Sequence, residues 1–376
     1  MLTLVSSLQC HILQNPDFEL PPSQISPNST VPFVQLNENN TIPGWTSQGT
    51  VQYVISGPSV PLPRNGHALL LAEDGKINQT FTANGDIKQY ILTFVIAFGG
   101  LNCSANVSLV VSAPDSASEF SVKQNYSKAA WQIYGHLLGS FGNGESIDLV
   151  LESQKIDTGT NSTCWLVVDS LKLKSISPST QGKDNLLSNG GFEFGPDFLD
   201  GFSEGVLLDS EPSLVESALQ EWSPTGTIRY IDSRHYFVPE GNAAIEMISG
   251  AGIQTAKALT DGSNYDLEFM LGDANDSCKG NFTIGVEAGT SAQNFTVQSK
   301  GTGSANKYSM KFKAGSSPAP ISFQSYTMVQ NGDGVLCGPV IDGVVLRPSK
   351  GHLSYPKSNV PQALLLLVLL LCLYGI

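Results

Sequence analysis

Charged residues are scarce in this sequence, and basic residues are the scarcest of them. Only 14% of the 376 residues are charged, against a typical value of about 25%, and 20 Lys and Arg face 33 Asp and Glu. The formal charge of −13 argues against a nucleic-acid partner, because phosphate binding needs basic side chains. Long runs of one charge are also missing, so a charged interaction tail is not expected.

Motifs for metal and cofactor binding are missing too. The six cysteines include no CxxC pair and the five histidines show no ligand spacing, so a zinc site is not expected. No glycine-rich loop follows a strand-like run and opens a helix, which leaves nucleotide binding unsupported. Asp273, Asn275 and Asp276 have oxygen ligands that suit Ca²⁺, but a turn is the better interpretation, because the corresponding stretch Phe98–Asn102 has no acidic residue. We therefore predict no cofactor and no metal.

Long amphipathic helical patterns are not evident, and short runs with alternating apolar residues take their place. Clear examples are Ile147–Glu152, Tyr265–Leu271 and Thr283–Glu287. Gly, Asn, Asp and Pro interrupt such runs about every 8–12 residues, a spacing typical of antiparallel sandwiches and jelly rolls. A hydrophobic content of 41% is high enough for a packed core. The pattern predicts an all-β protein.

An internal repeat divides the chain into two copies. Six pairs of landmarks recur at an offset of about 175 residues. The pairs are Asn15–Glu19 with Asn189–Glu193, Trp45 with Trp222, Gly66–Leu71 with Gly241–Glu246, Tyr90–Phe94 with Tyr265–Phe269, Cys103 with Cys278, and Cys164–Leu173 with Cys337–Leu346. The repeat predicts two tandem β-sandwich domains, residues 13–174 and 185–348, joined by a polar linker at 175–184. We expect the first and last strands of each copy, which bear the paired signatures, to lie together and close the sandwich.

The two ends of the chain are expected to be processed. Ala363–Ile376 is a run of 14 uncharged residues, shorter than the roughly 20 that a membrane-spanning helix needs. Residues 349–376 fit a GPI-attachment signal and spacer, with Ser349 or Ser354 as the attachment point. A short single-pass anchor or a buried C-terminal strand is the alternative. Residues 1–12 are interpreted as a weak secretion signal or a remnant of one.

Cysteine and asparagine positions indicate an extracellular chain. Cys10 and Cys372 lie in the two ends, and the simplest pairing of the other four cysteines gives one disulfide per half, Cys103–Cys164 and Cys278–Cys337. Each would close a loop of about 60 residues and stabilise the fold by about 4 kcal/mol. Asn-x-Ser/Thr sites exceed the number expected by chance, which is typical of a glycosylated secretory protein. The predicted glycosylation sites are Asn28, Asn39, Asn78, Asn106, Asn125, Asn161, Asn275, Asn281 and Asn294.

Seven motifs along the chain point to a known family, and they are densest in the second copy. The motifs are Ile42–Trp45, Asn189–Glu193, Gly205–Leu208, Tyr230–His235, Val238–Gly241, Gly272–Asn275 and Cys337–Asp342. Together they resemble the plant cell-wall family called domain of unknown function 642, whose members look like two consecutive galactose-binding-like jelly rolls. The first copy departs from the pattern, with Cys164-Trp-Leu where the family has Cys-Gly-Pro.

The resemblance covers the chain from about residue 13 to 348 and implies a place and a function. It implies a secreted or wall-associated protein that binds wall polysaccharides and associates with pectin methylesterase. Some members of the family look GPI-anchored, as the C-terminal tail of this chain also suggests.

One motif has the form of a catalytic signature. Gly201–Gly205 matches the nucleophile-elbow pattern around Ser203, but that pattern works only on a strand-to-helix turn. Here the motif follows a loop-like segment inside an all-β copy, so a glycine-rich loop is the better interpretation. Glycoside hydrolysis would need two placed carboxylates, and the acidic residues are scattered. We predict no catalytic residue.

The candidate binding residues are Arg234, His235 and Tyr236. Aromatic faces stack on sugar rings, and Arg and His donate hydrogen bonds to hydroxyl groups. The alternative is that Tyr236 packs beneath the loop and His235 is an ordinary surface residue.

Residues that recur in both copies are interpreted as structural. Trp45 and Trp222 occupy equivalent places and are expected to be core anchors rather than sugar platforms. Asp169 and Asp342 end short apolar runs, and we expect them to form turns or to bond the backbone.

The preferred hypothesis is a GPI-anchored protein of the cell wall and the outer face of the plasma membrane. It would bind wall polysaccharide without catalysis of its own, modulate wall enzymes such as pectin methylesterase, and contact the membrane only through the GPI lipid. One alternative is a carbohydrate-active hydrolase or esterase on a β-sandwich, and another is a protein–protein scaffold at the cell surface. The acidic charge disfavours de-esterified pectin, which is itself an anion, and suits a basic partner enzyme.

Overall fold

The computed structural model describes residues 12–23, 25, 33–56, 66–99, 107–155, 165–178, 184–210 and 217–349. Within these ranges the chain forms strands β1 to β24 and no helix. It follows that the described part of the chain has no apolar helix of membrane-spanning length.

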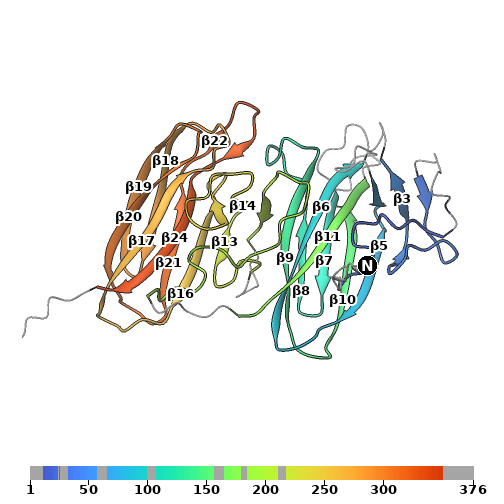
Figure 1. Ribbon diagram of the computed structural model, residues 1–376, viewed down its shortest axis with the longest axis horizontal. Helices are drawn as coiled ribbons and strands as arrows, with labels where there is room; N and C mark the ends of the chain where they lie inside the picture. The colour runs from blue at the N-terminus through green and yellow to red at the C-terminus, as the bar shows by residue number, and fades with distance from the viewer. Residues whose placement is uncertain are drawn as a thin grey trace, which may run out of the picture.

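Twelve strands form one continuous sheet along the molecule (Figure 1). Their order is β1-β3-β4-β11-β6-β9 in the first copy, followed by β12-β14-β15-β24-β17-β20 in the second. The first six are β1 (Phe33–Gln35), β3 (Val51–Ile55), β4 (His67–Leu71), β11 (Trp165–Ile176), β6 (Lys88–Gly99) and β9 (Trp131–Phe141). The second six are β12 (Val206–Leu208), β14 (Ile228–Asp232), β15 (Ala243–Glu246), β24 (Val340–Pro348), β17 (Asn264–Asp273) and β20 (Ser304–Lys313).

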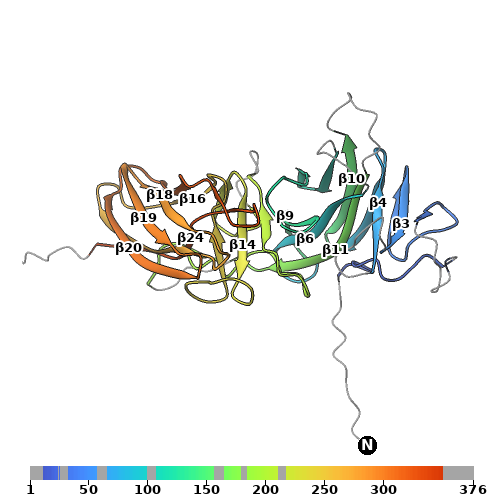
Figure 2. The same cartoon turned by 90° about the horizontal axis from the view of Figure 1, so that it is seen from above.

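Each half of the long sheet is covered by a five-stranded sheet, and Figure 2 shows both on the same side. The first has the order β2 (Thr46–Gln48), β5 (Lys76–Thr82), β10 (Ser146–Lys155), β7 (Val107–Ala113) and β8 (Ser116–Phe120). The second has the order β13 (Ser223–Thr225), β16 (Gly252–Lys257), β21 (Ala319–Ser325), β18 (Gly280–Ala288) and β19 (Ser291–Ser299). A short pair, β22 (Val329–Gln330) and β23 (Leu336–Cys337), completes the list of strands. The predicted all-β class with two tandem β-sandwich domains is confirmed. The jelly-roll, galactose-binding-like type stays a prediction.

The strand order is the same in both copies, and so is the geometry at the recurring landmarks. Asn15 and Asn189 both have positive φ, at 45° and 49°, in the turn that opens each copy. Each Asn side chain closes that turn: the amide of Asn189 donates to the carbonyl of Phe194 at 2.8 Å and accepts from its N–H at 2.9 Å. Asn tolerates the left-handed region better than most residues, which explains its place in the motif.

The opening segment of each copy lies against the last strand, as the paired signatures predicted. The N–H of Leu171 on β11 donates to the carbonyl of Pro16 at 2.8 Å, and the N–H of Val344 on β24 donates to the carbonyl of Gly190 at 2.7 Å. The segment itself is a turn rather than the strand that we expected. Strand β11 also continues to Ile176, so its end lies two residues beyond the predicted boundary at 174.

The two copies meet edge to edge between β9 and β12. Leu207 of β12 pairs with Tyr134 of β9 in parallel orientation. On the outward face of β9, Ile133 and Leu137 are buried in the same core as Leu208 of the second copy. The halves therefore share hydrophobic core as well as a sheet.

Close packing at this joint requires a glycine. Gly135 lies between Ile133 and Leu137 on β9, and a Cβ atom there would lie 2.8 Å from Cδ2 of Leu208 and 3.1 Å from Cβ of Pro196. Both distances are shorter than van der Waals contact, so any larger residue would push the copies apart.

Candidate functional site

The predicted binding loop is organised around one buried carboxylate. Asp232, at the end of β14, accepts hydrogen bonds from the backbone N–H groups of Arg234 (3.1 Å) and His235 (3.0 Å). The guanidinium of Arg234 lies 3.1 Å from the other Asp232 oxygen, and Nδ1 of His235 lies 2.9 Å from Asp232. The side chains of Arg234 and His235 are exposed, and both already contact Asp232 within the loop.

Tyr236 has a packing role in this loop. Its ring is half-buried against the small apolar cluster that includes Ile231. Its hydroxyl accepts a hydrogen bond from the N–H of Gly205 at 3.3 Å, and burial raises the pKa of Tyr236 to about 12. The structure thus brings Arg234, His235 and Tyr236 together, with the tyrosine beneath the loop.

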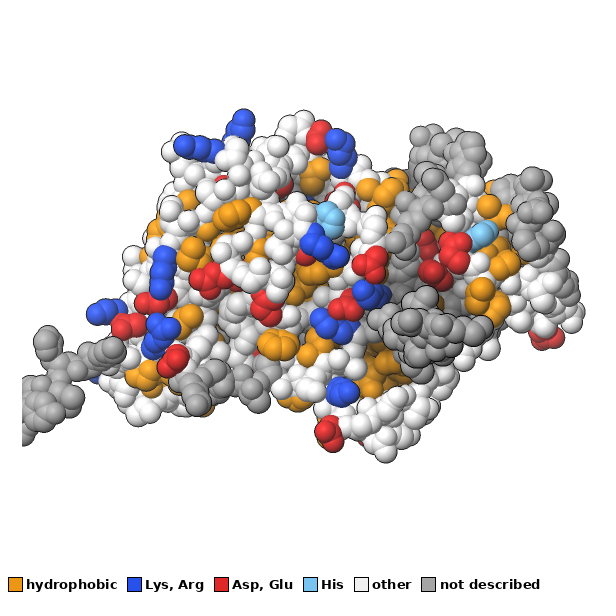
Figure 3. Space-filling model, in the orientation of Figure 1, with side chains coloured by type: hydrophobic (Ala, Val, Ile, Leu, Met, Phe, Trp, Pro, Cys, Tyr) orange, Lys and Arg blue, Asp and Glu red, His pale blue; other side chains and the backbone are white. Residues whose placement is uncertain are grey.

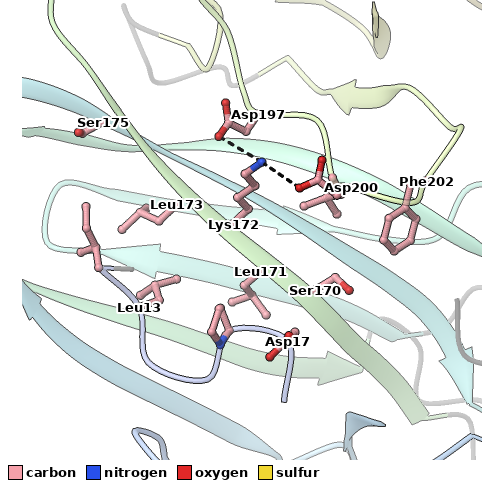
Figure 4. A pocket seen from close by; sticks show the side chains of 13 residues that line it. Leu13, Asp17, Ser170, Leu171, Lys172, Leu173, Ser175, Asp197, Asp200 and Phe202 are labelled. Atoms are coloured by element: carbon pink, nitrogen blue, oxygen red, sulfur yellow. Dashed lines mark ion pairs between the residues drawn. The ribbon is translucent and has the colours of Figure 1, made fainter. Parts of the chain in front are cut away.

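A pocket of about 380 Å³ lies beside this loop, where the two copies meet (Figure 4). Lys172 of β11 extends into it toward Asp197 and Asp200 of the second copy, at 3.6 Å and 3.9 Å. Arg234 reaches the same Asp200 at 3.9 Å. The two Lys172 pairs join the copies across the pocket, and the Arg234 pair links the binding loop to it. Figure 3 shows charged side chains of both signs gathered near the middle of the visible face.

A different kind of surface covers the second five-stranded sheet. On β13, β16 and β21 it presents hydroxyl and amide side chains, which we call the polar strip, beside the outward Ala256 and Pro320. On the next strand, β18, exposed Glu287 pairs with Ser322 at the margin of the strip. The strip consists of Ser223, Thr225, Gln254, Ser322 and Gln324. Neighbouring strands are about 4.8 Å apart, so these groups form a compact array of uncharged donors and acceptors.

Two glycines of this sheet leave room for larger side chains above them. Gly252 and Gly285 both pair with Gln324, from opposite sides. Oε1 of Gln324 and Oγ1 of Thr225 are 3.2 Å apart above Gly252, where a Cβ would lie 2.7 Å from each of them. Above Gly285 lies the phenol end of Tyr326, a ring that is 59% exposed.

The polar strip continues into a second pocket between the copies. This pocket has a volume of about 570 Å³, and Ser223 and Gln254 belong to both the strip and the pocket wall. Gln89 and Ser140 of the first copy line the opposite side, together with Gln220 and Thr255 from the second. Among the lining residues that the structure describes, Glu221 is the only carboxylate and none is Lys or Arg. A pocket of this size and lining suits a ligand rich in hydroxyl groups.

The equivalent face of the first copy carries charged residues. The row Thr225, Gly252, Gln324, Gly285, Asn294 runs across the second sheet through successive strand pairs. The equivalent row of the first sheet is Gln48, Lys76, Glu152, Val110, Glu119. Lys76 and Glu152 form an ion pair at 3.8 Å there, so this row is charged in the first copy and uncharged in the second.

The cysteine prediction can be followed in the second copy. Cys278 and Cys337 form a disulfide and are both buried. Asp276 lies close to the two sulfurs, but their covalent bond leaves this cluster no thiolate to hold a metal. Cys103 and Cys164 lie outside the described residues.

The sequon asparagines that the structure describes are mostly exposed. Asn39, Asn125, Asn275, Asn281 and Asn294 are exposed, and Asn78 is half-buried on β5. Asn28, Asn106 and Asn161 lie outside the described residues, as does Ser354. Ser349 follows β24 directly, where its hydroxyl lies 2.8 Å from Asp266 and its N–H donates to the carbonyl of Asn264.

The repeated residues that we interpreted as structural are indeed core groups. Trp45 is 4% exposed and Trp222 is 1% exposed, and each meets the Phe of its opening motif edge-on. Asp342 accepts backbone hydrogen bonds from Glu240 at 2.8 Å and Gly343 at 2.6 Å. Ser203 lies exposed in a loop before β12 and not on a strand-to-helix turn, which leaves the nucleophile-elbow pattern without its required setting.

The sequence profile described as "Protein of unknown function (DUF642)" matches residues 11–174 and 185–347. The chain belongs to the DUF642 family. Two relatives from Arabidopsis thaliana are "Protein DUF642 L-GALACTONO-1,4-LACTONE-RESPONSIVE GENE 2" and "Protein TEEBE", at 30% and 28% identity. Each alignment covers 89% of this chain and 90% of the relative. The resemblance found in the sequence motifs is thereby confirmed.

Similar solved structures are distant from this DUF642 protein. One is the tandem CBM22-1–CBM22-2 domain of Paenibacillus barcinonensis Xyn10C, at 10% identity and a TM-score of 0.27, covering 85% of this chain and 100% of that one. Another is TmCBM61 in complex with β-1,4-galactotriose, at 16% identity and a TM-score of 0.29, covering 44% and 97%. TM-scores this low support no inference about a ligand.

Sequence reasoning missed the polar strip, although a signal for it exists. Aligning the copies places uncharged Gln324 opposite Glu152, and Gly252 opposite Lys76. Charged residues of the first copy that are uncharged at the equivalent positions of the second indicate that this face of the second sheet has a different role.

Proposed function

We propose that this protein is an extracellular wall protein that binds neutral, hydroxyl-rich polysaccharide and has no catalytic activity of its own. The observation that supports the proposal is the uncharged polar strip of the second copy, which continues into the 570 Å³ pocket between the copies. Sugar hydroxyls both donate and accept hydrogen bonds, and amide and hydroxyl side chains do the same. A neutral glycan needs no counter-charge, whereas an anionic one would meet a chain of net charge −13.

The binding test changes two side chains of the strip that point to solvent. Gln254 is exposed and Ser322 is half-buried on the neighbouring strand, where the two residues pair. We expect the double variant Gln254→Ala, Ser322→Ala to weaken binding to neutral wall polysaccharides about tenfold or more, since two or more hydrogen bonds of about 1 kcal/mol each are lost. Titration calorimetry against a panel of neutral and acidic polysaccharides measures it.

The control lies on the equivalent face of the first copy. Glu152→Ala changes an outward side chain of that face, in the row that corresponds to Gln324 and Gly252, and binding should stay as in the wild type. Equal losses in both variants, or release of a shorter sugar product by the wild-type protein, would contradict the proposal.

The extracellular location of the protein and its GPI anchor are part of the same proposal. The excess of sequons and the apolar C-terminal run support a GPI-anchored protein at the wall and the outer face of the plasma membrane. Pectin methylesterase is the proposed enzyme partner, and the low basic content of the chain makes a basic enzyme the complementary one.

A further inference from the structure

Two sequons face each other on the hairpin of β18 and β19. Thr283 and Thr296, the third residues of the sequons of Asn281 and Asn294, are cross-strand partners whose hydroxyl oxygens lie 2.9 Å apart. The middle residues, both Phe, are buried beneath them. Alternation along a strand therefore places both asparagines on the outer face, where both are exposed.

The two asparagines differ in what lies opposite them. Asn281 is paired with Gln298, whereas Asn294 is paired with Gly285, which has no side chain. The phenol end of Tyr326 occupies the space above Gly285, where a Cβ would lie 2.8 Å from Cζ of the ring. The N–H of Tyr326 donates to the carbonyl of Thr283 at 2.9 Å, which holds the residue beside the hairpin.

Cross-strand geometry puts the tyrosine within reach of a sugar on Asn294. Directly opposite Cβ atoms in an antiparallel pair are about 5 Å apart. The phenol end of Tyr326 takes the place of the missing side chain at 285, so it lies about that far from Cβ of Asn294. Tyr326 is 59% exposed, which leaves ring surface that a sugar can cover.

We propose that Asn294 bears an N-linked glycan whose first sugar packs against the ring of Tyr326. In its attachment, the amide nitrogen of Asn294 bonds to the anomeric carbon of a lipid-linked oligosaccharide, and one N–H proton is released as the lipid diphosphate leaves. The apolar face of the first sugar then covers the aromatic ring. The inference rests on the extracellular route proposed above, because the oligosaccharide donor is met in secretion.

A free polysaccharide has the same stacking chemistry as the attached sugar. The attached sugar is favoured because its covalent link gives it a high effective concentration at the ring, which a free chain lacks. Strand β19 is also an edge of its sheet, and a glycan fixed there shields the edge from pairing with another chain.

The experiment uses the full chain secreted from plant cells, with Tyr326→Ala introduced into three backgrounds. In the wild-type background, with the glycan intact or trimmed to its first sugar, we expect Tyr326→Ala to lower Tm by about 2–4 °C, the shift that corresponds to about 1 kcal/mol in a domain of this size. In the Asn294→Gln background the same substitution should leave Tm unchanged. In the matched Asn281→Gln background the full shift should persist, because Asn281 has Gln298 opposite it. Glycopeptide mass spectrometry should find Asn294 occupied.

Several results would overturn the inference. An unoccupied Asn294 in a protein whose Asn281 is glycosylated would do so, as would an equal Tm shift from Tyr326→Ala in the Asn294→Gln background. Loss of polysaccharide binding by Tyr326→Ala in that same background would assign the ring to an external sugar instead. A secreted chain with no sequon occupied at all would overturn both this inference and the glycosylated extracellular route on which it rests.

Discussion

The buried carboxyls Asp169 and Asp342 occupy equivalent positions on the last strand of each copy. Both are nearly inaccessible, at 5% and 0% exposed, and burial raises the pKa of each to about 7. For Asp169 the negative charges of Glu19 and Asp17 raise the pKa further. A carboxyl in this state holds its proton in the folded protein at pH values where the unfolded chain has lost it.

This difference in pKa predicts how stability depends on pH. Because the folded pKa lies above the unfolded value of about 4, the free energy of unfolding should fall as the pH rises from about 4 to about 7. We expect Asp169→Asn to flatten this dependence by up to about 1.4 kcal/mol per pH unit, since the amide keeps the bond from the N–H of Ser170 but does not titrate. Urea unfolding across this pH range measures the slope. The exposed control Asp261→Asn should keep the wild-type slope, and an unchanged slope in Asp169→Asn would refute the assignment.

Among the elements, β9 and β20 occupy equivalent places in the two copies but have opposite surfaces. Tyr134 on β9 pairs with Phe94 and Tyr308 on β20 pairs with Phe269, which aligns the two strands residue by residue. The inner faces are alike. On the outer face, apolar residues of β9 correspond to lysines of β20. The pairs are Ile133 with Lys307 and Leu137 with Lys311.

The reason is that β9 is covered by the second copy and β20 is a free edge. Lys307 and Lys311 are 63% and 83% exposed, and charged residues on an edge prevent it from pairing with another chain. Comparing the copies position by position indicates that β9 is covered, because its outer positions are apolar where those of β20 are lysines. It does not indicate which strand of the second copy pairs with β9.

Exchanging these residues tests the assignment. Ile133→Lys places a charge in the core that the copies share, and we expect it to reduce the free energy of unfolding by about 3 kcal/mol or more. The reciprocal change, Lys307→Ile, affects an exposed position and should leave monomer stability within about 0.5 kcal/mol. Urea denaturation followed by intrinsic fluorescence measures both. Equal effects would mean that β9 is not covered in solution.

At the scale of the whole molecule, the two sandwiches form one body. Arg229 of the second copy bonds Glu246 at 2.6 Å and the carbonyl of Tyr126 in the first copy at 3.0 Å. Lys123 of the first copy lies 2.5 Å from Asp209 of the second. With the continuous sheet and the shared core, these bonds hold the pocket between the copies in a fixed shape, which lowers the ordering cost of binding.

The net charge of −13 acts at this scale too, because it sets the long-range field that a partner meets. We expect the proposed complex with a basic pectin methylesterase to weaken strongly between about 50 mM and about 500 mM NaCl, as the Debye length shortens. Surface plasmon resonance at stepped salt concentrations measures this, with an acidic isoform of the enzyme as the control. An affinity that does not change with salt would rule out charge as the basis of the association.

The sequence by itself determined the all-β class, the duplication, the disulfide of the second copy and the structural roles of Trp45, Trp222 and Asp342. These follow from period-two alternation, recurring motifs and burial preferences, which are local properties of the chain. Only the tertiary structure decided that the copies share one sheet, that Tyr236 lies beneath its loop, and that Tyr326 lies beside Asn294. Those relations depend on strand register and on contacts between segments far apart in sequence. Tyr236 and Tyr326 lie in loops after β14 and β21, where no alternation along the chain indicates what a side chain contacts. The pairing of β9 with β12 joins strands from two different copies, and the local pattern of neither strand names its partner.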